Sequence, residues 1–188
     1  TDIVESSASV DIDLQRVRIA LPDDFILPQG GLGIRWPDSP MEQEKRMMEY
    51  KWPAAVAYVR ANHLNRIVFN PPQAKLGLVS AGKAYLDLRQ ALQDIGLDNT
   101  ACAQLGIRLL KVGCIWPMDV QGLRDFSAGL EEIFVVEEKL PLLESGLKDA
   151  LYALSGPRPR IFGKTDEALL PKAGELNPAI LAQALAKW

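Results

Sequence analysis

The stretch LGLVSAGKAYLDLRQALQDIG, residues 76–96, combines a buried strand, a tight turn and an amphipathic helix. Residues 76–79 form the short apolar run that is typical of a strand buried on both faces. Beyond the turn at residues 80–82, apolar side chains recur at helical spacing before a C-terminal glycine, in the series Tyr85, Leu88, Leu92, Ile95 and then Gly96. The stretch therefore predicts a strand that leads directly into a helix.

Further apolar runs, separated by helix-sized segments, surround this unit. Strands are expected over residues 66–69, 107–112, 133–136 and 160–164. Asp98 and Asp119 are expected to cap two of the intervening helices, because aspartate accepts hydrogen bonds from first-turn N–H groups. Strand, helix and strand at this spacing require right-handed crossovers. We therefore expect an α/β fold with a mainly parallel sheet that is covered by helices on both faces.

The first part of the chain lacks this pattern. Residues 1–38 are expected to be an extended N-terminal arm, in which residues 17–20 form an edge strand before prolines and glycines interrupt regular structure. The remainder, residues 39–188, is expected to be a single α/β domain that begins with a helical segment over residues 39–65.

The helical segment has a recognisable start. Ser39-Pro40-Met41-Glu42 places a hydroxyl at the N-cap, proline at the first helical position and glutamate at the third, which is a capping box. Pro53 has no N–H to donate to the preceding turn. We therefore expect the helix to kink or to restart at Pro53.

Charge and residue inventory exclude several classes of protein. The 188 residues carry 21 Lys and Arg against 24 Asp and Glu, a net charge of −3, which argues against a nucleic-acid or anionic-membrane partner. No apolar run approaches the ~20 residues of a membrane helix, and the polar first residues lead us to expect no signal peptide. Cys102 and Cys114 lack C-x-x-C spacing and His63 is the only histidine, so no metal site is expected. Two isolated cysteines favour the reducing cytoplasm.

The turn after the first of these strands is a candidate anion-binding site. Gly82 lets the backbone approach a ligand closely, Ser80 offers a hydroxyl, and Lys83 adds a positive charge. The helix dipole favours an anion at the same place, such as a phosphate or part of a coenzyme A. The alternative is that Ser80 only caps the helix and that Lys83 is solvated.

Polar residues also follow the later strands. Gly113, Glu137 and Glu138 are candidates for a strand-end edge, with Lys164 beside them, because ligands of parallel sheets lie beyond the carboxyl ends of the strands. Paired carboxylates at this place can orient a ligand or transfer protons. The alternative is a solvated strand end whose glutamates pair with a nearby lysine.

Five blocks of the chain match a known family of enzymes. They are residues 31–38 (GLGIRWPD), 76–87 (LGLVSAGKAYLD), 111–117 (KVGCIWP), 129–139 (GLEEIFVVEEK) and 158–164 (RPRIFGK). In this order they resemble an internal domain of the large bacterial indolepyruvate:ferredoxin oxidoreductases, of the 2-oxoacid:ferredoxin oxidoreductase family. That domain is similar to the C-terminal domain of transketolase. The resemblance implies a three-layer α/β/α sandwich on a mixed, mostly parallel sheet of about five strands.

For the parent chain, the resemblance implies decarboxylation of indolepyruvate and other aryl 2-oxoacids on thiamine diphosphate and Mg²⁺. Electrons then pass through 4Fe-4S clusters to ferredoxin, and an aryl-acetyl-CoA forms from coenzyme A. The thiamine ylid supplies an electron sink that no side chain offers. The family's Gly-Asp-Gly…Asn motif and its cluster-ligating cysteines are absent from these 188 residues. No catalytic residue therefore carries over, and we expect no cofactor in this fragment.

We accordingly expect a non-catalytic structural or interface domain. We expect its partners to be other domains of the same polypeptide. The parent protein is expected to bind ferredoxin and an aryl 2-oxoacid, and the domain is also a candidate for forming a homodimer. Two alternatives remain: a self-sufficient Rossmann-like binder of a small molecule or nucleotide, and a pure interaction module. The missing G-x-G-x-x-G fingerprint counts against the first of these. Flanking thiamine and cluster motifs in the same reading frame would favour the oxidoreductase domain.

Overall fold

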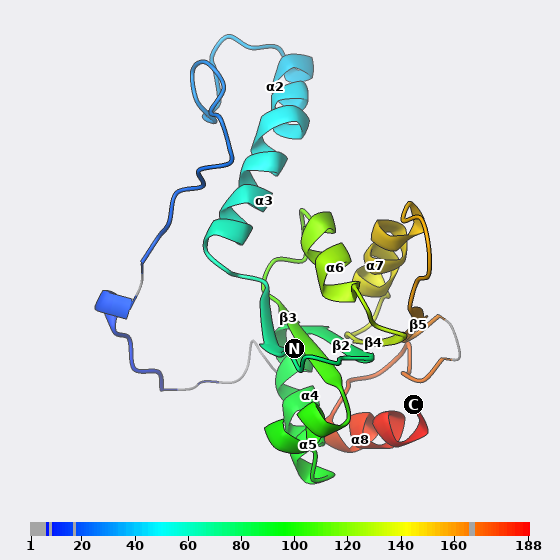
Figure 1. Ribbon diagram of the computed structural model, residues 1–188. Coiled ribbons are helices and arrows are strands. Elements are labelled where there is room, and N and C mark those ends of the chain that lie inside the picture. Colours follow the sequence, from blue (N-terminus) through cyan, green and yellow to red (C-terminus); the bar gives the residue numbers. More distant parts are fainter. Residues whose placement is uncertain (1–6, 8, 17, 166–167) are drawn as a thin grey trace.

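Five strands form one mixed sheet in the computed structural model, in the order β1-β3-β2-β4-β5 (Figure 1). They are β1 Arg66–Phe69, β2 Leu76–Ala81, β3 Ile107–Val112, β4 Glu132–Val136 and β5 Arg160–Phe162. β2 runs parallel to both β3 and β4, and β4 runs parallel to β5, while β1 lies antiparallel to β3. The structure describes residues 7, 9–16, 18–165 and 168–188.

Helices cover both faces of this sheet (Figure 1). One face carries α4 Gly82–Asp94, α5 Asn99–Gln104 and α8 Pro178–Lys187, and the other carries α6 Val120–Ser127 and α7 Leu142–Tyr152. Asp98 and Asp119 accept hydrogen bonds from the N–H groups of Ala101 and Gly122, which confirms both predicted N-caps. The predicted three-layer α/β/α sandwich on a five-strand, mostly parallel sheet is confirmed.

The core is divided into two apolar layers, one on each face of the sheet. Along β4, Phe134 and Val136 pack on the side of α4 and α8, whereas Ile133 and Val135 pack on the side of α6 and α7. All four side chains are 0% exposed. Because both faces are covered, an uninterrupted apolar run is stable here, where a strand with one solvated face would alternate.

A helical column precedes the sheet and projects away from it (Figure 1). It consists of α2 Pro40–Arg46, a π-helical turn Met47–Lys51 and α3 Trp52–Ala61. The Glu42 N–H donates to the Ser39 hydroxyl, and the Ser39 N–H donates to the Glu42 carboxylate at 2.7 Å, so the predicted capping box is confirmed. Neither this column nor any other helix among the described residues is long and apolar enough to cross a membrane.

The π-helical turn lies immediately before Pro53. The Trp52 N–H donates to the Met47 carbonyl, five residues back, before α-helical bonding resumes in α3. Proline removes one N–H from the helical ladder, and a π-helical turn is one way in which a helix accommodates such a gap. The expected restart of the helix at Pro53 is therefore a change from π-helical to α-helical hydrogen bonding.

The arm before the column contains no strand over residues 18–20, so the predicted edge strand is wrong there; Val17 lies outside the described residues. The backbone N–H of Ala20 instead donates to the side-chain oxygen of Asn62, and the Asn62 amide donates back to the Ala20 carbonyl, at 2.8 and 2.9 Å. One asparagine thus satisfies the groups that a neighbouring strand would have paired. The division of the chain into an arm, residues 1–38, and an α/β domain, residues 39–188, stays a prediction.

Candidate functional site

The carboxyl ends of β2, β3, β4 and β5 meet at one edge of the sheet. The chain leaves β2 toward β3 and leaves β4 toward β5, so the space between β2 and β4 is the switch point at which doubly wound sheets bind ligands. Ser80 and Lys83 lie on the β2 side of it, Glu137 and Glu138 follow β4, and Gly113 follows β3. The structure therefore places the predicted site residues along one edge, which we call the carboxyl edge.

The Ser80 side chain forms a hydrogen bond within the sheet. Its buried hydroxyl donates to the carbonyl of Val136 at 2.7 Å and so links β2 to β4. The N-cap of α4 is Ala81, and no side chain caps the helix, so the alternative in which Ser80 caps it is wrong. Gly82 supplies a left-handed backbone with φ of 55°, which lets the strand turn directly into α4.

Lys83 already has anionic partners. Its ammonium lies 2.7 Å from the Glu175 carboxylate and 2.9 Å from that of Asp87, and it donates to the Leu176 carbonyl at 3.1 Å. Hydrogen bonds to Glu175 and then Asp87 raise the pKa of Lys83 above its ordinary value. The cation at the start of α4 is thus neutralised by carboxylates of the same chain.

Anion binding at this turn stays a prediction, and the structure specifies the competitor. A phosphate must displace Glu175 from Lys83, so we expect weak binding to the native chain and stronger binding to Glu175→Gln. Phosphate titration with the Gly82 and Lys83 amides followed by nuclear magnetic resonance measures both. Amides that stay unmoved at millimolar phosphate in both proteins, or shifts that persist in Lys83→Ala, contradict the prediction.

Glu137 and Glu138 hold backbone groups of their own chain. The Glu137 carboxylate accepts hydrogen bonds from the N–H groups of Leu143 and Glu144, at 2.7 and 2.8 Å, and thereby caps α7. Burial raises the pKa of Glu137 although these two bonds favour its ionised form. Glu138 accepts a bond from the N–H of Leu176 at 3.0 Å. Neither carboxylate is a solvated strand end paired with lysine, as the alternative proposed.

Glu144 is the most enclosed charge of the edge, and sequence analysis missed it. Its carboxylate is buried and accepts bonds from the Lys164 N–H at 2.7 Å, the Lys148 ammonium at 2.8 Å and the Thr165 hydroxyl. The signal was available in the helical spacing, because Glu144 precedes the inward-facing Leu147 by three positions. A glutamate on an apolar stripe indicates a buried, satisfied carboxylate.

Residues 168–177, which we call the edge segment, run along the carboxyl edge and are fastened to it. The buried ammonium of Lys164 donates to the Pro171 carbonyl at 2.6 Å. Leu176 is held by Glu138 on the β4 side and by Lys83 on the α4 side, and its side chain is 1% exposed. The switch point is therefore bridged by the chain's own residues.

Gly113 marks a close approach between two segments. A Cβ at this position would collide with the carbonyl oxygen of Leu64, in the turn between α3 and β1. The Gly113 N–H donates to the Asn65 side chain at 3.0 Å, which fixes the same contact. Gly113 thus allows the segment after β3 to pack closely against the turn between α3 and β1, and this packing explains why a glycine occupies the position.

Replacing Gly113 by alanine should lower the free energy of unfolding by about 1–3 kcal/mol, because backbone must move to admit the methyl group. Denaturant unfolding measures the change. Gly33→Ala is the matched control, since nothing lies within 4 Å of its Cβ position. Equal stability of the two variants would contradict the assignment.

The remaining polar candidates offer no assembled chemistry. Burial raises the pKa of the Cys102 thiol, Cys114 donates to the Trp116 carbonyl at 3.3 Å, and His63 lies exposed in the turn after α3. Within residues 7, 9–16, 18–165 and 168–188, no group of three or more His, Cys, Asp or Glu side chains is placed to hold a metal ion.

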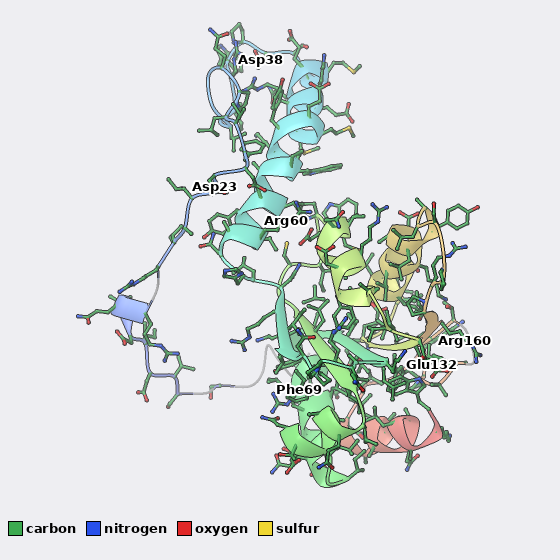
Figure 2. The ribbon with its side chains drawn as sticks, in the orientation of Figure 1. Asp23, Asp38, Arg60, Phe69, Glu132 and Arg160 are labelled. Atoms are coloured by element: carbon green, nitrogen blue, oxygen red, sulfur yellow. The ribbon has the colours of Figure 1, made fainter. Side chains whose placement is uncertain are left out.

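One hollow lies away from the carboxyl edge. A cavity of about 650 Å³ opens between α4 and α5, lined among others by Phe69, Arg89, Leu97 and Thr100. Figure 2 places Phe69 at the end of β1, where its ring lies 5.0 Å from the Arg89 guanidinium. The cavity contains none of the predicted site residues.

Comparison with known proteins identifies relatives of this fold. The sequence model of the indolepyruvate oxidoreductase domain matches residues 66–188. The indolepyruvate oxidoreductase subunit IorA of Pyrococcus abyssi is 29% identical over 159 residues, which cover 82% of this chain and 22% of that protein. IorA of Thermococcus kodakarensis is 30% identical over 129 residues, covering 66% and 18%. These relatives are archaeal, so the bacterial origin that the resemblance implied stays a prediction.

A solved structure agrees on the fold. The 2-oxoglutarate:ferredoxin oxidoreductase from Magnetococcus marinus matches with a TM-score of 0.51 and 15% sequence identity, over 80% of this chain and 24% of that one. The chain spans about a fifth of the length of the curated relatives that it matches. Since the domain match extends over residues 66–188, the chain belongs to the indolepyruvate oxidoreductase domain family.

Proposed function

We propose that this chain is a non-catalytic structural and interface domain of a 2-oxoacid:ferredoxin oxidoreductase. The parent polypeptide would convert indolepyruvate or another aryl 2-oxoacid, coenzyme A and oxidised ferredoxin into an aryl-acetyl-CoA, CO2 and reduced ferredoxin. Membership of the indolepyruvate oxidoreductase domain family supports this proposal over an independent nucleotide-binding or interaction module. The two free cysteines are consistent with a cytoplasmic location.

The observation that best supports a non-catalytic role is that the charged side chains of the carboxyl edge are already bound by residues of the same chain. At the switch point, where a ligand of this fold would bind, Lys83 and Glu138 hold Leu176 of the edge segment instead. Glu137 and Glu144 accept backbone hydrogen bonds, and Lys164 donates to a backbone carbonyl. Charged groups that satisfy their own backbone stabilise a scaffold and are not free to act on a substrate.

The cofactors of the proposed parent do not fit the residues present. A 4Fe-4S cluster takes four cysteine ligands, and this chain has two, of which Cys102 is buried with a raised pKa. Glu137 and Glu144 use both carboxylate oxygens to accept hydrogen bonds from their own chain, so they do not offer the free oxygen ligands that Mg²⁺ requires. Thiamine diphosphate, Mg²⁺ and the clusters would therefore reside in other parts of the parent.

Expression of the whole reading frame that encodes this chain tests the proposal. The complete polypeptide should reduce ferredoxin with indolepyruvate and coenzyme A, whereas the 188-residue chain should neither reduce ferredoxin nor bind thiamine diphosphate in calorimetry. Micromolar binding of thiamine diphosphate to the 188-residue chain, or a complete polypeptide inactive with every aryl 2-oxoacid tried, would overturn it.

A further inference from the structure

The segment that precedes the sheet exposes an unusual amount of apolar surface. We call residues 18–61 the leading segment; it comprises the end of the arm and the helical column. Its strongly exposed apolar side chains are Ile19, Leu21, Ile26, Leu27, Ile34, Trp36 and Met41, with exposed fractions from 63% for Leu27 to 93% for Trp36. Single exposed apolar residues are ordinary on a protein surface, but a series of this length on one segment marks an interaction site.

The α/β domain offers these side chains no place. Both faces of the sheet are covered, by α4, α5 and α8 on one side and by α6 and α7 on the other. Figure 1 shows the arm and the helical column extending away from these layers. The apolar side chains of the leading segment therefore need a surface other than that of their own domain.

The leading segment nevertheless has a defined shape. The Arg46 guanidinium donates to the Gly31 carbonyl, and the Gln43 amide donates to the Asp38 carbonyl at 3.0 Å, so the arm is folded against α2. At the other end, Arg60 of α3 donates to the Asp119 carboxylate at 2.8 Å. Figure 2 shows Asp38 and Arg60 at opposite ends of the column. A pre-formed segment loses little conformational entropy when it binds.

The apolar surface continues onto the α/β domain. A groove of about 500 Å³ lies between the arm, α3 and the start of α6, and its apolar lining includes Phe25, Trp52, Val56 and Met118. The Trp116 ring meets the Trp52 ring edge-on, with 5.7 Å between their centroids, and Trp116 is 62% exposed. The leading segment and the loop after β3 thus form one docking surface.

Charge indicates which kind of partner fits. Residues 18–61 contain six Lys and Arg and six Asp and Glu, so the segment has no net charge. A neutral segment has no electrostatic attraction for nucleic acid or for an anionic lipid surface. Recognition must then come from burial of apolar area, which points to an apolar protein face.

We propose that the leading segment docks on an apolar face of a neighbouring domain of the same, longer polypeptide. The identity of that polypeptide rests on the proposed function. The Pyrococcus abyssi relative matches 82% of this chain, more than residues 66–188 provide, so its match extends into residues 1–65, and it covers only 22% of that protein. In this relative, the counterpart of at least part of the leading segment thus belongs to a chain with much additional polypeptide to receive it.

Hydrogen exchange, read by mass spectrometry, compares the 188-residue chain with the complete polypeptide of its reading frame. Amides of residues 18–61 should exchange about tenfold more slowly in the complete polypeptide, while those of residues 107–112 and 132–136 stay unchanged. The double variant Ile34→Glu and Trp36→Glu should restore fast exchange. Leu86→Glu, at a 64% exposed position on α4, is the matched control and should leave the protection intact.

Two outcomes overturn the proposal. Equal exchange of residues 18–61 in both proteins means that no neighbouring domain covers them. A 188-residue chain that sediments as a dimer, with a protected segment exposed again by the double variant, makes a second copy the occupant. Ferredoxin reduction by the complete polypeptide is measured separately: protection without activity retains the docking and rejects the proposed function, and activity without protection does the reverse.

Discussion

Val135→Asp should abolish cooperative folding of the chain. Val135 is 0% exposed in β4, whose neighbours in the sheet are β2 and β5, and its side chain packs in the layer under α6 and α7. An aspartate there would bury a charge with no partner, which costs more than about 4 kcal/mol. That loss is a large part of the total free energy of unfolding of a domain of this size.

Circular dichroism during urea titration measures the effect of Val135→Asp. The cooperative transition of the native chain should be lost, or its midpoint should shift to very low denaturant. Leu140→Asp is the control, because Leu140 is 79% exposed and its replacement should change stability by less than about 0.5 kcal/mol. A Val135→Asp protein with the native midpoint would mean that Val135 is not buried in β4 as described.

Glu144→Ala should be nearly as disruptive, although it removes a polar side chain. The substitution leaves the N–H groups of Lys164 and Thr165 without their acceptor and the Lys148 ammonium without its carboxylate. Breaking a buried, fully satisfied network costs about 3 kcal/mol. Glu131→Ala is the matched control, because Glu131 pairs with Lys75 at the surface and such a pair contributes well under ~1 kcal/mol.

The same carboxylate predicts a dependence of stability on pH. Burial alone would raise the pKa of Glu144, but hydrogen bonds from Lys148, Thr165 and the Lys164 N–H outweigh it and lower the pKa below its ordinary value of 4.5. A carboxyl group with a lowered folded-state pKa contributes stability above the unfolded-state value and loses it as pH falls through the folded-state value.

The free-energy difference between the native chain and Glu144→Gln should therefore shrink as pH falls from ~6 to ~3. Making the same comparison in a Glu137→Gln background separates this residue from Glu137, whose raised pKa acts with the opposite sign and is partly caused by the Glu144 charge. Denaturant unfolding at a series of pH values measures the difference. A constant difference across that range would show that folding does not lower the pKa of Glu144.

Local patterns in the sequence predicted most of the fold. The strand over residues 107–112 has the predicted bounds, and the caps at Asp98 and Asp119 are formed as expected. β2 extends to Ala81, two residues beyond the predicted apolar run, because Ser80 pairs in register with Val136 and Ala81 with Val112. Those pairings involve residues far apart in the chain, so no local pattern announces them.

The candidate site was predicted in its location but not in its interactions. Parallel strands necessarily gather their carboxyl ends, which is why Lys83 and Glu138 reach one edge. Lys83 is bound by Asp87 on its own helix and also by Glu175 and Leu176. The latter two come from a segment more than 90 residues later that has no periodic pattern. Sequence analysis recognises chemically able side chains, whereas their availability depends on long-range pairing.

The antiparallel direction of β1 has a consequence for the architecture of any larger assembly. Arg66, the first residue of β1, pairs with Lys111 near the end of β3, so the chain enters the sheet from the carboxyl edge. A parallel β1 would have moved that entry by about 13 Å, the length of a four-residue strand, to the far side of the sheet. The orientation of one peripheral strand therefore directs the upstream polypeptide to the side where the loops after β3 and β4 emerge. A body seated on that polypeptide can touch those loops without reaching around the sheet.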